Sequence, residues 1–255
     1  MPFDPLQLNG LSILGVRGES IPFSPNRVQL DFCKWQSGRD IILKSRQMGI
    51  TTLIQAMIYH QVSTYQNYQA ITLPHHAVTL SRLSERFNHF HERNPLLMYR
   101  PRRNYFSFPQ LGSSYYLTGK FPVGDSFDLI HMNELAYREN GMRELEHFDT
   151  RRKNGWAIIE STINPHNLAF MKLCIGALSN WNGWRLHFYE WWWDDRYQLP
   201  IYEPLKFDKA ETELMEQKGL TPEQINWRRR RIQQLGPENF QREYPESVEV
   251  CLGLK

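Results

Sequence analysis

Short apolar runs alternate with longer amphipathic segments over most of the chain. The runs have the length and composition of strands buried on both faces, and the longer segments carry apolar residues at helical spacing. Aromatic and turn residues at 104–119 predict a hairpin or paired short strands. We predict strands at 41–43, 69–73, 128–132, 156–160 and 184–190, and helices at 51–64, 76–93, 142–153 and 167–178.

This alternation predicts an α/β fold with a mostly parallel central sheet flanked by helices. The pattern changes at about Pro200, after which only helices are predicted. The sequence Thr221-Pro222-Glu223-Gln224 marks one helix start, with a capping hydroxyl, a proline in the first turn and a glutamine three residues after the cap. We therefore expect a core at 1–199, which begins with a loosely structured entry at 1–35, and a small helical subdomain at 200–255.

Composition and charge exclude several classes of protein. No apolar run approaches the roughly 18 residues that a membrane span needs, so we expect no membrane partner. The three cysteines are far apart, which argues against a disulfide framework or a cysteine metal site. The net charge is only +3, so basic clusters such as 228–231 are either phosphate contacts or solvated helix faces. The run Trp191-Trp192-Trp193 is expected in the core or at a subunit interface rather than in base stacking.

A candidate phosphate-binding loop joins the first predicted strand to the first predicted helix. It consists of Lys44, Ser45, Arg46, Gln47, Met48, Gly49, Ile50, Thr51 and Thr52. In such a loop, backbone N–H groups surround the anion, a lysine adds charge and a hydroxyl at the helix start holds magnesium. Ile50 replaces the usual lysine after the glycine, but Lys44 can reach the phosphates from the strand end, with Arg46 as a second charge. The alternative is an ordinary strand-to-helix turn with a surface lysine.

Polar residues follow two further predicted strands. Asn133-Glu134 stands where a nucleotide hydrolase places one acid for magnesium and a second for the attacking water. Glu134 fits the second role, whereas Asn133 offers only a neutral oxygen to a metal-bound water. Ser161-Thr162 follows the next strand, where hydroxyls can sense the γ-phosphate. Taken alone, each pair fits a helix cap or a turn better, but the carboxyl ends of parallel strands line one crevice.

In this order, the segments resemble the ATPase domain of the tailed-phage terminase large subunit over nearly the whole chain. The loop at 44–52 resembles the variant Walker A loop with a displaced lysine that part of that family carries, and 130–136 resembles the Walker B segment. Residues 160–165 resemble the coupling motif. Gln29, otherwise a plain surface amide, stands where the family's adenine-binding glutamine is expected. The tail is similar to the family's closing segment, at 219–224, 227–229 and 241–245.

The resemblance implies an ASCE-type P-loop NTPase that uses ATP and Mg²⁺ to move double-stranded DNA into a procapsid. It also implies a homo-oligomeric ring on a portal protein, a small terminase subunit as partner, and a location in the host cytoplasm. The implied site residues are Lys44, Arg46, Thr51 and, through a water, Asn133 for phosphate and magnesium; Glu134 for catalysis; Ser161 and Thr162 for coupling; and Arg100, Arg102 or Arg103 as an arginine finger for a neighbouring subunit.

The sequence departs from the family pattern in two places. Asn133 stands where an aspartate is usual, which puts direct magnesium contact by that side chain in doubt. The chain stops at Lys255, where a full-length subunit continues into an RNase H-like nuclease, so we expect a fragment, a split gene product or a truncated relative without nuclease activity. Two alternatives stay open: a helicase-like translocase of the same fold, and a non-hydrolysing relic that docks on DNA or a portal.

Overall fold

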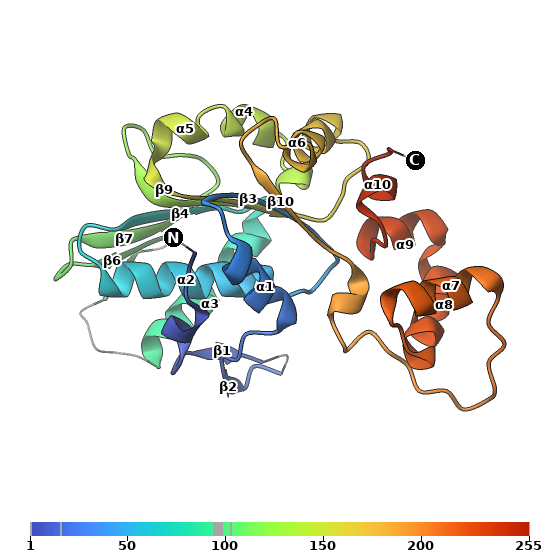
Figure 1. The fold of residues 1–255 in the computed structure, drawn as a ribbon. Coiled ribbons are helices and arrows are strands. Elements are labelled where there is room, and N and C mark those ends of the chain that lie inside the picture. The colour runs from blue at the N-terminus through green and yellow to red at the C-terminus, as the bar shows by residue number, and fades with distance from the viewer. Residues whose placement is uncertain (1, 16, 94–98, 103, 255) are drawn as a thin grey trace.

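The computed structural model describes residues 2–15, 17–93, 99–102 and 104–254, and its centre is one large twisted sheet (Figure 1). The strand order is β10-β3-β9-β8-β4-β7-β6-β5. Neighbours pair in parallel from β10 to β7, and β6 and β5 add an antiparallel edge. The predicted α/β fold with a mostly parallel sheet is confirmed. The strands are β3 (Arg39–Lys44), β4 (Gln69–Leu73), β5 (Arg100–Arg102), β6 (Tyr105–Phe108), β7 (Ser113–Leu117), β8 (Phe127–Asn133), β9 (Arg152–Ser161) and β10 (Arg185–Tyr189).

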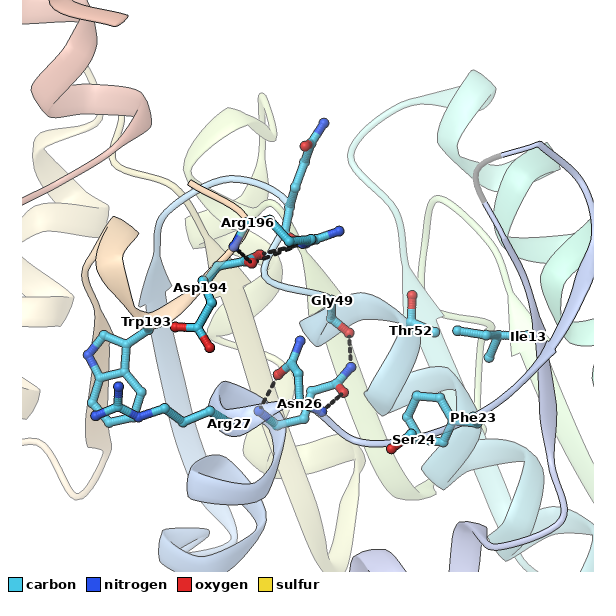
Figure 2. Close-up of a pocket in the computed structure, with 13 residues that line it drawn as sticks. Ile13, Phe23, Ser24, Asn26, Arg27, Gly49, Thr52, Trp193, Asp194 and Arg196 are labelled. Atoms are coloured by element: carbon cyan, nitrogen blue, oxygen red, sulfur yellow. Dashed lines mark hydrogen bonds and ion pairs between the residues drawn. The ribbon is translucent and has the colours of Figure 1, made fainter. Parts of the chain in front are cut away.

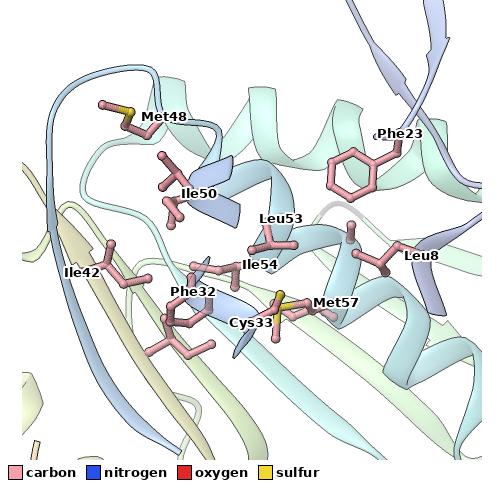
Figure 3. Close-up of a cluster of buried hydrophobic side chains, with 14 of the residues drawn as sticks. Leu8, Phe23, Phe32, Cys33, Ile42, Met48, Ile50, Leu53, Ile54 and Met57 are labelled. Atoms are coloured by element: carbon pink, nitrogen blue, oxygen red, sulfur yellow. The ribbon is translucent and has the colours of Figure 1, made fainter. Parts of the chain in front are cut away.

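Helices cover both faces of the sheet (Figure 1). One face carries α1 (Arg27–Trp35), α2 (Ile50–Thr64) and α3 (Ala77–Glu92), and the other carries α4 (Gly141–Leu145), α5 (Phe148–Arg151) and α6 (Leu168–Leu178). Each face has its own apolar core, and successive residues of β3 alternate between them. Ile42 packs under α1 and α2 (Figure 3), whereas Ile41 and Leu43 belong to the opposite cluster. This alternation explains why a short run of apolar residues predicted a strand buried on both faces.

The predicted helix at 142–153 is wrong in its continuity and in its last two residues. It breaks into the short helices α4 and α5, and residues from Arg152 onward join β9. The reason is sheet pairing: β8 and β9 lie in register from the Phe127–Arg152 pair, with an irregularity between Phe127 and Leu129. Gly155 allows this close approach, because a Cβ there would lie 1.7 Å from the carbonyl oxygen of Asp128. Tertiary pairing thus overrides the helical pattern of the segment.

The predicted loose entry at 1–35 is also wrong. It contains a short 3₁₀ turn (Pro5–Leu8), a hairpin of β1 (Ser12–Leu14) and β2 (Ser20–Pro22), and helix α1. Phe3, Leu8 and Phe23 are buried in the α2 side of the core. Helix α1 starts with a capping box, in which Asn26 and Gln29 satisfy each other's backbone N–H groups.

The tail is helical, as predicted, with α7 (Lys209–Lys218), α8 (Pro222–Leu235), α9 (Pro237–Glu243) and α10 (Val248–Cys251). Thr221 and Gln224 form the predicted capping box of α8. Trp227 of α8 lies with its ring centroid 4.7 Å from that of Tyr197 and 4.8 Å from that of Trp191. Of the three tryptophans predicted in the core or at an interface, Trp191 and Trp192 are buried in the core, whereas Trp193 is only partly buried. The aromatic cluster joins the tail to the end of β10.

Among the described residues, no helix is both long and apolar enough to cross a membrane.

Candidate functional site

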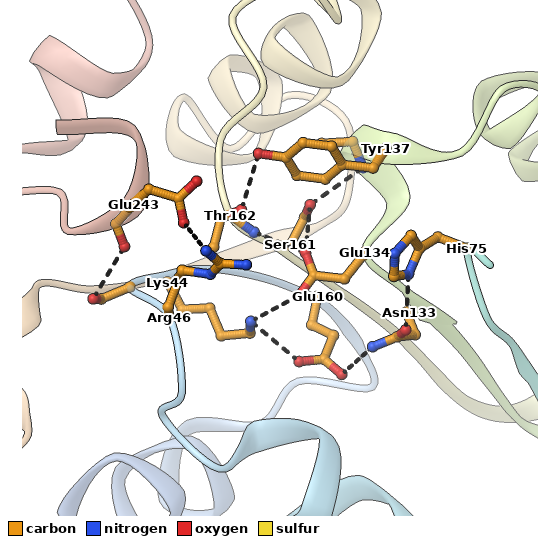
Figure 4. A network of polar contacts seen from close by, with 12 residues as sticks. Lys44, Arg46, His75, Asn133, Glu134, Tyr137, Glu160, Ser161, Thr162 and Glu243 are labelled. Carbon is orange, nitrogen blue, oxygen red and sulfur yellow. Dashed lines mark hydrogen bonds and ion pairs between the residues drawn. The ribbon is translucent and has the colours of Figure 1, made fainter. Parts of the chain in front are cut away.

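The loop between β3 and α2 turns sharply before the helix begins. Gly49, the residue before α2, has φ 75°, and Gln47 has φ 56°, a left-handed conformation that non-glycine residues rarely adopt. Ile50 stands where the standard loop has its lysine. It is 1% exposed and packs into the core (Figure 3), so a side chain at this position points away from the outer face of the loop. Lys44 is the last residue of β3, and its side chain points into the site (Figure 4). The loop therefore combines the N-terminus of α2 with a lysine from the strand end, which together suit an anion.

Lys44 lies between two carboxylates from neighbouring strands (Figure 4). Its Nζ atom is 3.2 Å from Oε1 of Glu134 and 3.6 Å from Oε2 of Glu160. Because β3, β9 and β8 are adjacent and parallel, their carboxyl ends bring these three residues together. The structure thus places the displaced lysine beside the predicted catalytic glutamate.

Glu134 is fixed by the next strand end. Its Oε2 atom accepts hydrogen bonds from Ser161 Oγ (3.2 Å) and from the backbone N–H of Thr162 (3.2 Å). Its backbone is left-handed, with φ 52°, and such strain is held at sites where the surrounding structure over-determines it. The Thr162 hydroxyl donates to Tyr137 Oη (3.2 Å), which in turn donates to the carbonyl of Ile163 (2.9 Å). The predicted residues Lys44, Glu134, Ser161 and Thr162 therefore form one network.

Glu160 is a member of this network that was not predicted as a site residue. It is fully buried, and its Oε1 atom accepts a hydrogen bond from Asn133 Nδ2 (3.1 Å) and lies 3.1 Å from His131 Nε2. Burial favours the neutral acid, but the Lys44 ammonium, His131 and the nearby hydroxyl of Thr51 outweigh it and lower the pKa of Glu160 to about 2. For Lys44, burial lowers the pKa, and the two carboxylates more than offset this and raise it. The sequence did offer one signal for Glu160: it is an acid inside a strand that was predicted to be buried. A buried carboxylate needs a charged or hydrogen-bonding partner.

The buried, ionised carboxylate of Glu160 predicts that the protein loses stability in acid. The folded pKa of Glu160 lies below its ordinary value of 4.5, so the stabilisation is complete above pH 4.5 and is lost as the pH falls toward the folded pKa. Between about pH 4.5 and pH 3, the free energy of unfolding should fall by about 2 kcal/mol more in the wild type than in Glu160→Gln. Urea unfolding at several pH values measures this, and equal pH slopes for the two proteins would contradict the ionised state of Glu160.

The tail reaches the loop through α9. Arg46 Nη1 forms an ion pair with Glu243 Oε2 (2.9 Å), and the carbonyl of Glu243 accepts hydrogen bonds from Ser45 Oγ (3.3 Å) and the backbone N–H of Arg46 (3.1 Å) (Figure 4). The Arg46 side chain is still 60% exposed, so its guanidinium can reorient toward a ligand. The closing segment of the chain thus contacts the loop directly.

Two cavities lie on either side of the loop. The first, of about 320 Å³, is lined by Lys44, Arg46, His75, Glu134 and Thr162, among others. The second, of about 440 Å³, lies between α1, the start of α2 and the Trp193 region (Figure 2). Gln47 lines both. One of these cavities is therefore next to Lys44 and the other is next to Trp193.

Gln29 lines the second cavity, but its amide is already engaged. Its Nε2 donates to the carbonyl of Gly49 (2.8 Å), and its Oε1 accepts from the backbone N–H of Asn26 (2.9 Å). Asn26 also donates to the carbonyl of Met48 (3.2 Å). In this structure Gln29 holds the loop between β3 and α2, and contact with an adenine edge stays a prediction. Beside it, the guanidinium of Arg27 lies 4.4 Å from the ring centroid of Trp193.

Two of the three predicted arginine-finger candidates lie far from this site within the chain. Arg100 and Arg102 are exposed on β5, six strand spacings from β3, or roughly 29 Å. Arg103 falls outside the described residues. A finger donated to a neighbouring copy stays a prediction. In the basic cluster at 228–231, Arg228 forms an ion pair with Glu246 and Arg229 forms one with Glu211, so two of its four arginines have carboxylate partners within the chain.

No protein-family model matches the chain, and no curated protein matches it. Solved structures do. The HK97 bacteriophage large terminase matches with a TM-score of 0.65 and 15% identity, over 94% of this chain and 53% of that protein. The Thermus phage P74-26 large terminase ATPase domain matches with a TM-score of 0.59 and 14% identity, over 87% of this chain and 93% of that domain.

A third match is the large terminase of another thermophilic bacteriophage, in complex with ADP, with a TM-score of 0.56 and 13% identity, over 86% of this chain and 52% of that protein. The chain thus spans about half the length of the HK97 protein and of this third protein, and most of the separate ATPase domain. Together with the loop and the network of strand ends, these matches show that the chain has the fold of a phage large terminase ATPase domain.

Proposed function

We propose that this chain hydrolyses ATP to drive double-stranded DNA into a viral procapsid. The observation that carries the proposal is the network at the carboxyl edge of the sheet. There Lys44 beside the phosphate loop contacts Glu134, and Ser161 and Thr162 hold that same carboxylate. The ADP complex of a protein with this fold supports a nucleotide as the ligand.

In the proposed complex the adenosine occupies the cavity beside Trp193 and the γ-phosphate occupies the cavity beside Lys44. Lys44 then exchanges its carboxylate partners for phosphate oxygens, and Arg46 can leave Glu243 for the same anion. Glu134, freed from Lys44, orients the attacking water and accepts its proton. Mg²⁺ bound with the ATP would neutralise phosphate charge, and the oxygens near the loop, from Thr51 and the buried carboxylate of Glu160, suit such a hard cation.

Release of phosphate would change the partners of Ser161 and Thr162. Both bond to Glu134, and Thr162 continues through Tyr137 to the backbone before α6. Glu243 provides a second route, from Arg46 to the helical tail. We propose that these contacts couple hydrolysis to movement of DNA by a ring of copies on a portal, assisted by a small terminase subunit, in the host cytoplasm.

Substitution of Gln29 separates its two possible roles. Gln29→Ala removes the bond to Gly49 that shapes the loop, so affinity for ATP should fall by about 5- to 150-fold, the value of one buried hydrogen bond with its desolvation. Equal weakening of ATP and GTP binding means that Gln29 only positions the loop. A selective loss for ATP means that it contacts adenine. Unchanged affinity for both nucleotides would contradict either role. Fluorescent-nucleotide titration measures these affinities.

A triplex-displacement assay tests movement along DNA. A motor that tracks double-stranded DNA should remove a bound third-strand oligonucleotide in an ATP-dependent way without separating the duplex. Strand separation would instead favour the helicase-like alternative. Binding of DNA without ATP turnover would favour the non-hydrolysing relic. The assay needs high protein concentration, because neighbouring copies are expected to complete the site.

A further inference from the structure

The site lacks an acid at the place where one is expected for a metal ion. Asn133 ends β8, and its side chain donates an amide hydrogen to Glu160 and lies 3.4 Å from His75 Nδ1. An amide offers a divalent cation or its bound waters only a neutral oxygen, without the negative charge of a carboxylate. A phosphate-bound Mg²⁺ usually takes one or two carboxylates from the protein.

The missing carboxylate is present on the neighbouring strand. Asn133 and Glu160 are direct cross-strand partners in the parallel pairing of β8 and β9. A glutamate side chain is one methylene longer than that of the aspartate usual at position 133. Glu160 is also beside the hydroxyl of Thr51 in the first turn of α2, the residue predicted for magnesium. Glu160 therefore lies between the loop at 44–52 and the end of β8, which Glu134 follows.

Among the described residues, one oxygen of Glu160 has no donor in hydrogen-bonding geometry. Oε1 contacts both Asn133 and His131, whereas Oε2 is buried and meets no donor at hydrogen-bonding distance and angle, although the Thr51 hydroxyl lies near the carboxylate. The nearest cation to Oε2 is Lys44 Nζ at 3.6 Å, and Lys44 is closer to Glu134. A buried carboxylate oxygen without a donor is costly, which indicates that a ligand satisfies it in the working state. When Lys44 turns to the phosphates, that oxygen loses its remaining partner.

We propose that Glu160 supplies the carboxylate of the metal site, in place of the acid that position 133 lacks. The ligand is a divalent cation, Mg²⁺ or Mn²⁺, bound together with nucleotide phosphates and the hydroxyl of Thr51. This inference rests on the proposed function, because it needs a nucleotide at the loop. It assigns to Glu160 a role beyond neutralising Lys44.

Binding of Mn²⁺ in the presence of ATPγS tests the proposal, with free Mn²⁺ followed by electron paramagnetic resonance. Glu160→Gln should weaken Mn²⁺ binding by about 10- to 100-fold, the range seen when a supporting ligand of a metal site is lost. Without metal, in EDTA, the same variant should bind ATPγS as well as the wild type or better, because a negative charge near the phosphates is gone. Weaker Mn²⁺ binding together with unchanged or tighter metal-free ATPγS binding distinguishes a metal role from general damage to the site, which would weaken both.

A charge swap gives the sharper comparison. Asn133→Asp combined with Glu160→Gln returns one carboxylate to the same pair of strands, so it should recover most of the lost Mn²⁺ affinity. Glu211→Gln is the matched control. Glu211 is, like Glu160, a buried carboxylate with a basic partner, here Arg229 in the tail, and its loss should leave Mn²⁺ affinity unchanged. If Glu160→Gln does not fold, Glu160→Asp keeps the charge beside Lys44 and should still weaken Mn²⁺ binding.

The possible failures are distinct. Mn²⁺ affinity that is unchanged in folded Glu160→Gln, or in Glu160→Asp when only that variant folds, overturns the inference and leaves the proposed function intact. A swap variant as weak as Glu160→Gln overturns it too. A wild-type chain that binds no ATPγS, with or without Mn²⁺, overturns the proposed function and this inference with it.

Discussion

Replacing Glu134 with glutamine should lower the kcat for ATP hydrolysis by about 10²- to 10⁴-fold, the usual contribution of a general base. Glutamine has the size of glutamate and can keep a bond from Ser161 or Thr162, so the strand ends should stay in place. It cannot accept a proton from water. Nucleotide affinity should therefore change little, while turnover almost disappears. Phosphate release and fluorescent-nucleotide titration on the same samples measure the two quantities.

Glu139→Gln is the control for that experiment. Glu139 is exposed and five residues along the chain, and it does not line the cavity beside Lys44. Its replacement should leave kcat unchanged. A Glu134→Gln protein that turns over ATP at the wild-type rate would remove Glu134 from the catalytic role, whatever the nucleotide affinity.

Replacing Lys44 with methionine should abolish nucleotide binding and also destabilise the fold. Glu160 would then be buried with its main positive partner gone, and breaking a buried ion pair by removing one member costs about 3–5 kcal/mol. Denaturant unfolding measures this loss. The double variant Lys44→Met with Glu160→Gln should regain much of the stability, because the uncompensated charge is gone, but should still fail to bind ATP.

Lys153→Met is the matched control for Lys44. Lys153 also pairs with an acid, Asp128 at 3.4 Å, but its side chain is 45% exposed. Solvent screens such a pair, so its loss should cost at most about 1 kcal/mol. If Lys44→Met and Lys153→Met lose the same small stability, Lys44 is not the buried partner of Glu160 that the structure describes.

The fold was largely predictable because its strands are apolar on both faces. Ile41, Ile42 and Leu43 alternate between two cores, and a continuous apolar run this short is typical of a strand in a parallel sheet covered on both sides. The helix predicted at 142–153 was wrong at its end because residues from Arg152 onward pair with β8, an interaction that local periodicity cannot reveal. Helix α1 was missed although Asn26 and Gln29 have capping-box spacing, since prolines and glycines around it predicted a loop.

The candidate site was predictable where residues directly follow strands. Lys44, Glu134, Ser161 and Thr162 follow or end strands whose carboxyl edges meet, and strand order brings them together. Glu160 escaped prediction because its role depends on which residue faces it across the β8–β9 pair. The contact of Glu243 with Arg46 joins residues 197 positions apart, and only the folded tail reveals it.

The central claim is that Lys44, although displaced from the usual position, makes this loop an ATP site. The most direct measurement is Mg²⁺-dependent phosphate release from ATP by the wild-type chain at high protein concentration, with Lys44→Met measured beside it. Phosphate release by the wild type should require Mg²⁺, and the variant should release none. Release by a folded Lys44→Met protein at the wild-type rate, or no release by the wild type at any concentration, would contradict this claim.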